Sequence, residues 1–211
     1  MISVVITAGG TSSRFKGQNK LLFELDGKPI IFHTVNTFLK LDFVNEIIVS
    51  ANESIIETLN LMFKGIDKIK VIKGGNTRQE SVYLGLQNCS NCDYVIIHDG
   101  ARPFITQSVI SSCLDKAKEV GGAIVAVKTV DTIKIVDENG LVVSTPDRKT
   151  LWNAQTPQIF KYDLIYSFHE KYKNENFTDD SLLFEKEGYK VAIFEGEYSN
   201  RKITTINDVK N

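Results

Sequence analysis

Short apolar runs return at regular intervals along the chain, and each is bounded by Gly, Asp, Asn or Ser. They cover residues 4–6, 47–49, 69–72, 94–97 and 123–127. Several are apolar almost without interruption, as strands buried on both faces of a parallel sheet must be. We therefore predict a buried strand at each of these runs.

Helix-like stretches lie between the runs, at residues 29–39, 77–86 and 109–120. Their apolar residues recur with the spacing of one face of an α-helix. Strands and helices in alternation predict an α/β fold, Rossmann-like, with a mostly parallel sheet and helices on both faces. Ligands bind such sheets beyond the carboxyl ends of the strands, so the loops that follow the strands are the places to look for chemistry.

Residues 131–148 break this rhythm. Ile133 and Ile135 alternate with polar residues, the turn Asp-Glu-Asn-Gly follows, and Leu141 and Val143 complete the pattern of a β-hairpin. Such an insertion can be an arm that packs on a second subunit, and a plain surface hairpin is the alternative. We interpret residues 1–211 as a single domain with a protruding β-arm, used in a homodimer.

Composition and charge limit the partners. Of the 211 residues, 42% are hydrophobic and 24% charged, and the formal net charge is -1. Nothing here indicates a nucleic acid or an acidic membrane surface as partner, and any anion must be held by a local cluster of cations. No apolar run approaches the roughly 18 to 20 residues that span a bilayer. The first residues resemble a strand and not a signal peptide, so we expect a cytoplasmic protein.

The cysteines give little further information. Cys89 and Cys92 form one C-x-x-C, with no second pair and no nearby histidine to complete a zinc site. We interpret them as free thiols in a reducing cytosol, with a redox or metal role as the alternative.

The first candidate for chemistry follows the first strand, in T-A-G-G-T-S-S-R-F-K-G-Q-N-K, residues 7–20. Gly9 and Gly10 would let backbone N–H groups approach phosphate oxygens closely. The loop matches neither G-x-G-x-x-G nor the G-K-[ST] phosphate loop. Arg14 and Lys20 could neutralise a triphosphate and its leaving pyrophosphate, or they could be two solvated cations.

The second candidate is K-G-G-N-T-R-Q-E-S-V, residues 73–82, again directly after a strand. The glycines allow close backbone approach, and polar side chains at a helix start suit the edges of a nucleobase. The residues concerned are Gly74, Gly75, Asn76, Arg78 and Ser81. A plain helix N-terminus capped by Asn76 or Thr77 is the alternative.

The third candidate is V-I-I-H-D-G-A-R-P, residues 95–103. Asp99 just past the strand is well placed for a ribose hydroxyl or a hydrated Mg²⁺, and His98 is expected to be structural. Further along, T-D-D-S is expected to open a helix, with Thr178 or Asp179 as a cap or a contact, and Lys202 is expected at the head of a short strand.

Cations and hydroxyls of the C-terminal half form a possible second site. Arg102, Arg148 and Lys202 would make a cationic patch that suits a phosphomonoester, with Thr156 in T-P-Q near them. Each of these residues alone could be an ordinary surface or structural residue.

Taken in order, these motifs resemble the IspD family of cytidylyltransferases. The resemblance rests on T-A-G-G-T-S-S-R-F with Lys20, G-G-N-T-R-Q-E-S-V, H-D-G-A-R-P-F, D-R-K-T-L-W-N-A-Q-T-P-Q-I-F, T-D-D-S and N-R-K-I-T-T, and it covers essentially the whole chain. It implies a nucleotidyltransferase-type fold. It also implies transfer of CMP from CTP to 2-C-methyl-D-erythritol 4-phosphate with Mg²⁺ and release of pyrophosphate, in non-mevalonate isoprenoid synthesis.

The resemblance also assigns roles to residues. Arg14 and Lys20 would stabilise the transition state at the α-phosphate, with Arg148 and Lys202 as the other catalytic cations. The CTP site would comprise Ala8, Gly9, Gly10, Gly74, Gly75, Asn76, Ser81, Asp99 and Gly100. Arg102, Thr156 and Thr178 would bind the acceptor, Asp99 the metal, and Arg148 would reach the acceptor phosphate of a neighbouring subunit.

Several positions depart from the family pattern. They are Ser12, Asn19, Leu21, Gly100 and Ser199, where glycine, proline, glutamine, alanine and an acidic residue are common. A pentitol-phosphate enzyme such as a ribitol-5-phosphate cytidylyltransferase shares nearly all the motifs. A sugar-1-phosphate nucleotidylyltransferase using UTP or GTP and a non-catalytic nucleotide-binding module are broader alternatives.

Overall fold

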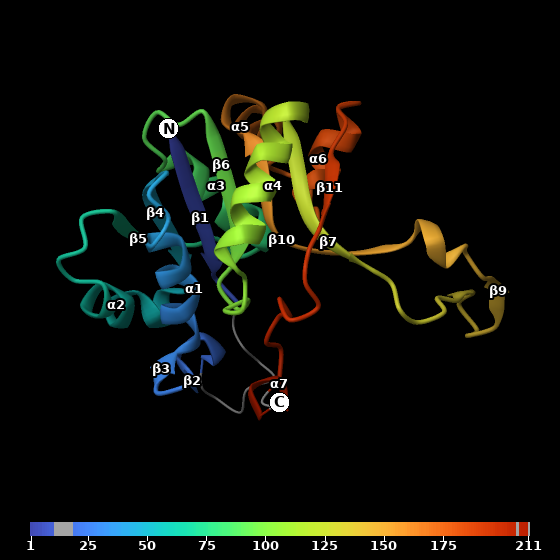
Figure 1. Ribbon diagram of the computed structural model, residues 1–211, viewed down its shortest axis with the longest axis horizontal. Coiled ribbons are helices and arrows are strands. Elements are labelled where there is room, and N and C mark those ends of the chain that lie inside the picture. Colours follow the sequence, from blue (N-terminus) through green and yellow to red (C-terminus); the bar gives the residue numbers. More distant parts are fainter. Residues whose placement is uncertain (11–18, 206, 211) are drawn as a thin grey trace.

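The computed structural model describes residues 1–10, 19–205 and 207–210. Its centre is a seven-stranded sheet with the strand order β11-β7-β10-β6-β1-β4-β5 (Figure 1). These strands are β1 (Ile2–Ala8), β4 (Val44–Ala51), β5 (Ile69–Lys73), β6 (Tyr94–Asp99), β7 (Gly122–Lys128), β10 (Trp152–Lys161) and β11 (Ala192–Glu195).

Most neighbours in this sheet are parallel. β1 lies between β4 and β6, so that Val5 is paired with Ile48 on one side and with Ile97 on the other. β10 is antiparallel to both β6 and β7. The predicted α/β fold with a mostly parallel sheet is confirmed, and the predicted runs are β1, β4, β5, β6 and β7.

Helices cover both faces of the sheet because successive side chains of a strand point to opposite faces. Val4 and Ile6 pack in one hydrophobic cluster with α1 (Ile30–Leu39), α2 (Glu53–Met62) and α4 (Gln107–Val120). Val5 packs in the other with α3 (Arg78–Gln87), α5 (Tyr162–Lys171) and α6 (Ser181–Lys186). The predicted helices at 29–39, 77–86 and 109–120 are α1, α3 and α4.

The predicted hairpin is also present. β8 (Ile135–Val136) and β9 (Val142–Ser144) form a two-stranded antiparallel sheet, followed by the 3-10 helix η2 (Arg148–Thr150). Figure 1 shows this β-arm extending from the body on the side opposite α2. Its apolar side chains are exposed, Leu141 to 66% and Val143 to 64%. Its use in a homodimer, and the treatment of residues 1–211 as one domain, stay predictions.

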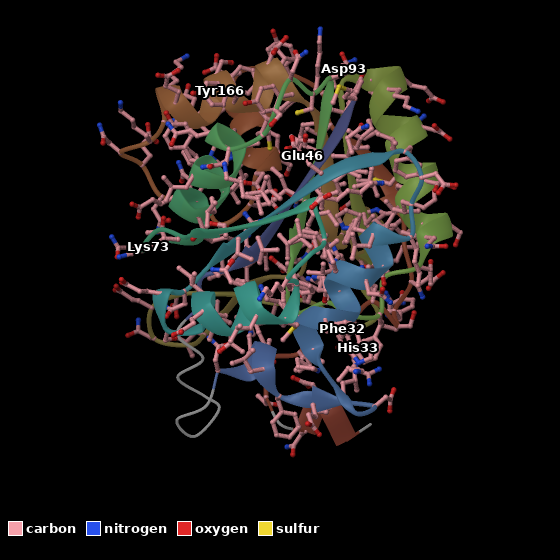
Figure 2. The ribbon with its side chains drawn as sticks, turned by 90° about the vertical axis from the view of Figure 1, so that its left-hand side faces the viewer. Phe32, His33, Glu46, Lys73, Asp93 and Tyr166 are labelled. Carbon is pink, nitrogen blue, oxygen red and sulfur yellow. The ribbon has the colours of Figure 1, made fainter. Side chains whose placement is uncertain are left out.

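The two ends of the sheet differ in what surrounds them. Asp93 precedes β6 at the amino end, and Figure 2 shows it at the opposite end of the molecule from His33 near the start of α1. At the carboxyl end lie the hairpin of β2 (Glu24–Leu25) and β3 (Lys28–Pro29) and the C-terminal α7 (Asn207–Lys210), as Figure 1 shows. The 3-10 helix η1 (Lys20–Leu22) lies at the same end, with Lys20 and Leu21 beside the ends of β1 and β6.

The expectation of a short strand at Lys202 is wrong. Residues 201–205 form no strand, because this stretch bonds to separate parts of the fold instead of lying along a sheet edge. The Ile203 amide donates to the Ala101 carbonyl at 2.8 Å, and Asn200 Nδ2 donates to the Thr156 carbonyl at 2.9 Å. Among the described helices, none has the length and apolar character needed to cross a membrane.

Candidate active site

A cavity opens at the carboxyl ends of β1 and β6, where the sequence predicted the chemistry. Residues far apart in the chain line it together. They are Thr7, Ala8, Gly9, Gly10, Lys20, Leu21, Gly75, Asn76, Thr77, Arg78, Ser81, Asp99, Gly100, Ala101 and Lys202. All the predicted CTP-site residues except Gly74 are in this set, as are two of the predicted catalytic cations, Lys20 and Lys202. Arg14 and Ser12 lie outside the described residues.

The turn after β5 reaches the cavity through close backbone contacts. A Cβ on Gly9 would lie 2.8 Å from Ser81 Oγ, so the end of β1 and the start of α3 approach where Gly9 has no side chain. Ser81 Oγ accepts from the Gly75 amide at 3.1 Å and donates to the Thr77 carbonyl at 2.9 Å. Gly74 is bound behind the cavity wall, its amide donating to the Ala51 carbonyl at 2.8 Å. Ser81 therefore holds the turn in shape.

The start of α3 is capped as one of the sequence alternatives proposed. Thr77 is the N-cap, and its Oγ1 accepts from the Glu80 amide at 3.0 Å. The Glu80 carboxylate accepts in return from the Asn76 amide at 2.6 Å. This pair of bonds resembles a capping box and fixes Asn76 and Arg78 at the cavity. The turn that caps α3 therefore also forms part of the cavity wall.

Asp99 is the electrostatic centre of the cavity. Its carboxylate lies 2.9 Å from Lys202 Nζ, 3.4 Å from Arg102 Nε and 3.6 Å from Arg78 Nε, and only 8% of its side chain is exposed. Burial alone would raise the pKa of Asp99, but these cations, with Lys202 foremost, hold that pKa well below its usual range. Asp99 is therefore a buried, ionised carboxylate at neutral pH.

The C-terminal segment brings Lys202 to this carboxylate and also contacts Lys20. Lys202 is part of this segment, and so is Ile203, whose carbonyl accepts a hydrogen bond from Lys20 Nζ at 3.1 Å. Arg102 Nη1 donates to the Asn200 carbonyl at 2.8 Å, which ties the segment to the loop after β6. Lys20 and Lys202 thus meet at one cavity although they come from opposite ends of the chain.

None of the predicted acceptor residues is in the cavity lining. Thr156 is buried, and its Oγ1 accepts from the Asp99 amide at 3.0 Å. The Arg102 side chain is 12% exposed beside Asp99, and Thr178 is exposed just before α6. Arg148 is exposed on the β-arm, where Nη1 donates to the Val130 carbonyl at 2.8 Å. Their roles toward an acceptor stay predictions.

His98 has the environment of a structural residue. Its side chain is fully buried, and Nε2 lies 3.1 Å from the Arg102 carbonyl. A carbonyl can only accept, so Nε2 carries the proton. Burial lowers the pKa of His98 to about 4, which leaves the ring neutral at physiological pH.

The family model of IspD, 2-C-methyl-D-erythritol 4-phosphate cytidylyltransferase, matches residues 2–211. The chain belongs to the IspD family. A protein of Clostridium botulinum (strain Eklund 17B / Type B), named 2-C-methyl-D-erythritol 4-phosphate cytidylyltransferase, is 42% identical, with 99% of this chain and 96% of that one covered.

Solved structures of IspD proteins have the same fold. The 4-diphosphocytidyl-2C-methyl-D-erythritol synthase from Anaerococcus prevotii gives a TM-score of 0.89 at 34% identity, over 99% of this chain and 92% of that one. The Francisella tularensis enzyme gives a TM-score of 0.85 at 30% identity, over 99% and 96%. The resemblance that the motifs indicated is therefore confirmed.

Except for Ser12, which lies outside the described residues, the departures from the IspD pattern each have a place in the structure. Asn19 caps η1, where its Oδ1 accepts from the Leu21 amide at 3.0 Å, and Leu21 is buried at the cavity wall. A Cβ on Gly100 would lie 2.9 Å from the Thr7 carbonyl oxygen, so this chain packs more tightly there than alanine allows. Ser199 donates to Glu197 at the surface at 3.1 Å.

Sequence reasoning gave no role to the ion pair that leads away from the cavity. Arg78 was named as a donor of the turn, but its partner Asp180 was not identified, although Arg78 Nη2 and Asp180 Oδ2 are 2.7 Å apart. Thr7 and Ala101 also line the cavity without having been predicted. The sequence does show two acidic residues, Asp179 and Asp180, at the predicted helix start in T-D-D-S. It does not show which of the two is buried and pairs with Arg78.

Asp99 is the one carboxylate among the described residues that line the cavity, and it could serve as an oxygen ligand for a divalent cation. No three His, Cys, Asp or Glu side chains of the described chain gather as a protein-made metal site requires. Mg²⁺ often needs no such set, because it keeps several waters and binds one or two carboxylates together with substrate phosphates. An ionised Asp99 at the cavity wall fits that mode of binding.

Proposed function

We propose that this chain transfers CMP from CTP to 2-C-methyl-D-erythritol 4-phosphate, giving 4-diphosphocytidyl-2-C-methyl-D-erythritol and pyrophosphate. Membership of the IspD family supports the reaction. The observation that carries it is the convergence of Lys20, Arg78 and Lys202 on one cavity with the ionised Asp99. Two phosphorylated anions must meet there, and cations reduce their repulsion.

The reaction needs no covalent enzyme intermediate. A phosphate oxygen of the acceptor attacks the α-phosphorus of CTP, a new P–O bond forms, and the bond to the bridging oxygen breaks to release pyrophosphate. Catalysis is then a matter of positioning and of stabilising charge. The hydroxyl of Ser81 is engaged with the backbone of its own turn and is not a nucleophile.

The residues that line the cavity support a separate role for each part of the site. The turn at Gly75 and Asn76 offers backbone groups to the cytosine, in a space that suits a pyrimidine. Gly9 and Gly10 would follow the triphosphate, while Lys20 and Lys202 would face the phosphates. Arg14 lies outside the described residues, and its role beside them is what the family resemblance implies. Asp99 would hold the ribose and Mg²⁺, which supplies additional positive charge to the phosphates when bound.

We propose that the acceptor site is completed by a second copy of the chain. Arg148 lies on the β-arm, away from the cavity of its own subunit, and the exposed apolar residues of that arm suit burial against a partner. In a homodimer, Arg148 would reach the acceptor phosphate held near Arg102, Thr156 and Thr178. We infer a cytoplasmic enzyme, since both substrates are soluble phosphates.

Release of pyrophosphate from purified protein, Mg²⁺ and CTP tests the proposal. We expect release with 2-C-methyl-D-erythritol 4-phosphate and little with ribitol 5-phosphate, UTP or GTP. Faster turnover with ribitol 5-phosphate would assign the pentitol reaction instead. Binding of CTP with no pyrophosphate release from any acceptor would indicate a nucleotide-binding module.

A further inference from the structure

A chain of three side chains leads from the cavity wall into the buried interior of the protein. Arg78 Nη2 lies 2.7 Å from Asp180 Oδ2, and Asp180 Oδ1 lies 3.1 Å from His169 Nε2. Asp180 is 2% exposed and His169 is fully buried. The carboxylate can only accept, so His169 Nε2 carries the proton that points at Asp180.

Arg78 connects this chain to the ligand side. Its guanidinium uses Nε toward Asp99 at 3.6 Å and Nη2 toward Asp180 at 2.7 Å, so one planar cation spans two carboxylates from the end of β6 and the start of α6. Its side chain is 24% exposed and lines the cavity. Arg78 therefore has one face toward the ligand and the other toward Asp180.

Asp180 stands at the N-cap position of α6, but capping of this helix does not explain why a carboxylate is buried there. Its side chain makes no capping bond to that helix. The neighbouring Asp179 does this work, because its Oδ1 accepts from the Ser181 amide at 2.8 Å and its Oδ2 from Gln158 Nε2 at 2.6 Å. A buried carboxylate that the helix does not use is left with Arg78 and His169 as its partners.

We propose that Asp180 is a positioning residue of the nucleotide site. It holds the Arg78 guanidinium at the cavity wall against Asp99, and His169 fixes the carboxylate from behind. When the phosphates of the nucleotide attract Lys202 away from Asp99, Arg78 stays as the partner of Asp99 because Asp180 anchors it. This inference rests on the proposed function for the identity of the nucleotide, CTP.

Charge explains why an anchor is needed. Burial by itself would lower the pKa of Arg78, but Asp180 first and then Asp99 raise it above its usual value, so the guanidinium stays charged. Without Asp180, this cation would be free to turn toward the phosphates and leave Asp99. With Asp180 in place, the planar guanidinium of Arg78 is held in one orientation before the nucleotide binds.

A double-mutant cycle on the full-length protein tests the proposal. Asp180→Asn should lower kcat/KM for CTP by roughly tenfold to a hundredfold, as loss of a supporting partner does at other sites, with little change in KM for the acceptor. In an Arg78→Gln background, the same substitution should cost less than about twofold, because its effect passes through Arg78. Asp180→Glu, which keeps the charge, should recover most of the activity.

Asp179→Asn is the matched control, since it changes the same chemical group one position earlier. We expect it to lower thermal stability while kcat/KM for CTP stays close to that of the wild type. Equal losses from Asp180→Asn in both backgrounds, or the same kinetic loss in Asp179→Asn, would overturn the proposal. If Asp180→Asn does not fold, failure of Asp180→Glu to outperform Asp180→Ala in CTP affinity would overturn it as well.

Calorimetric binding of CTP without acceptor separates this inference from the proposed function. If the wild type binds CTP but forms no product, the proposed reaction fails, and the comparison of CTP affinity between the wild type and Asp180→Asn still decides the role of Asp180. If the wild type turns over and the cycle shows no coupling, only the positioning role fails.

Discussion

The ammonium group of Lys202 lies 2.9 Å from Oδ2 of Asp99, which joins the C-terminal segment to the carboxyl end of β6. The next residue, Ile203, accepts from Lys20 Nζ at 3.1 Å, and its amide donates to Ala101 at 2.8 Å. One irregular segment therefore supplies one lysine to the cavity and positions the other. Its lack of regular structure is compatible with this role, since its bonds go to η1 and to the end of β6 and the residues after it.

Lys20→Ala and Lys202→Ala should each lower kcat strongly. Removing one preorganised charge from a transition state commonly costs about 3 to 4 kcal/mol, or roughly a hundredfold to a thousandfold in rate. Pyrophosphate release at saturating CTP and acceptor measures the effect. Circular dichroism should show an unchanged fold, because Lys202 is exposed, Lys20 is half-buried, and both line the cavity.

Lys116→Ala is the control for these lysine variants. Lys116 is an exposed residue of α4 whose Nζ pairs with Glu119 at 2.7 Å on the surface. Such pairs contribute little, about 0 to 1 kcal/mol, to stability, and this one is remote from the cavity. We expect wild-type turnover. Turnover of Lys20→Ala equal to that of Lys116→Ala would remove Lys20 from the mechanism.

Arg148→Ala should mainly weaken use of the acceptor. If the β-arm completes the site of a second subunit, KM for the acceptor rises while the affinity for CTP is kept. Mixed dimers of Arg148→Ala with Lys20→Ala should then recover one working site, because one of the two cavities combines an intact Lys20 with an intact Arg148. Verified mixed dimers without recovered activity would count against a shared site.

The ionisation of Asp180 should make the fold sensitive to acid. Burial opposes its charge, but Arg78 and then His169 lower the pKa of Asp180 from 3.8 to about 2. A lowered pKa means that the stabilisation is present above pH 4 and is lost as the pH falls toward 2, because the unfolded state takes up the proton first. The shift corresponds to about 2 kcal/mol.

Urea unfolding of the wild type and of Asp180→Asn at several pH values between 6 and 2 measures this contribution. Other carboxylates titrate in both proteins, so the difference between the two curves isolates Asp180. We expect the difference in the free energy of unfolding to shrink as the pH falls below 4. A difference that stays constant across this range would show that the ionisation of Asp180 does not stabilise the fold.

The sequence predicted the parts of the fold that have a strong local pattern. Buried parallel strands such as β1 and β6 are continuous apolar runs, and α1 and α4 repeat at helical spacing, so their periodicity was sufficient. β10 was missed because Trp152–Lys161 carries Gln and Pro residues among its apolar ones and pairs antiparallel in the middle of the sheet. The stretch at Lys202 looked like a strand, but its amides donate to Ala101 after β6 and to Asp208 of α7, and not to a neighbouring strand.

The site was predictable where glycines and charges follow strands, and unpredictable where it depends on tertiary pairing. Asp99 and the turn at Gly75 could be placed from strand ends alone. The pairs Arg78 with Asp180 and Lys20 with Ile203 join positions that no local pattern relates. Physical reading of a single sequence finds the charged residues, but it does not show which of them share a partner.

Gly85 should be the most sensitive position for the placement of α3. A Cβ there would lie 2.4 Å from Val5 Cγ1, so α3 can approach β1 only because Gly85 has no side chain. Alanine gains about 1 kcal/mol over glycine in helix propensity, but overpacking a tight core costs about 1 to 3 kcal/mol. We expect Gly85→Ala to be destabilising overall in urea unfolding.

The same substitution should also affect the cavity, because α3 carries Arg78 and Ser81 at its start. If α3 moves away from the sheet, both residues shift, and KM for CTP should rise along with the loss of stability. Combining Gly85→Ala with Val5→Ala removes the clashing methyl groups, so the double variant should be less destabilised than the sum of the single variants. Gln87→Ala, at an exposed position of α3, is the control and should change stability by less than about 0.5 kcal/mol. Strict additivity of the two core substitutions would mean that α3 is not seated against Val5.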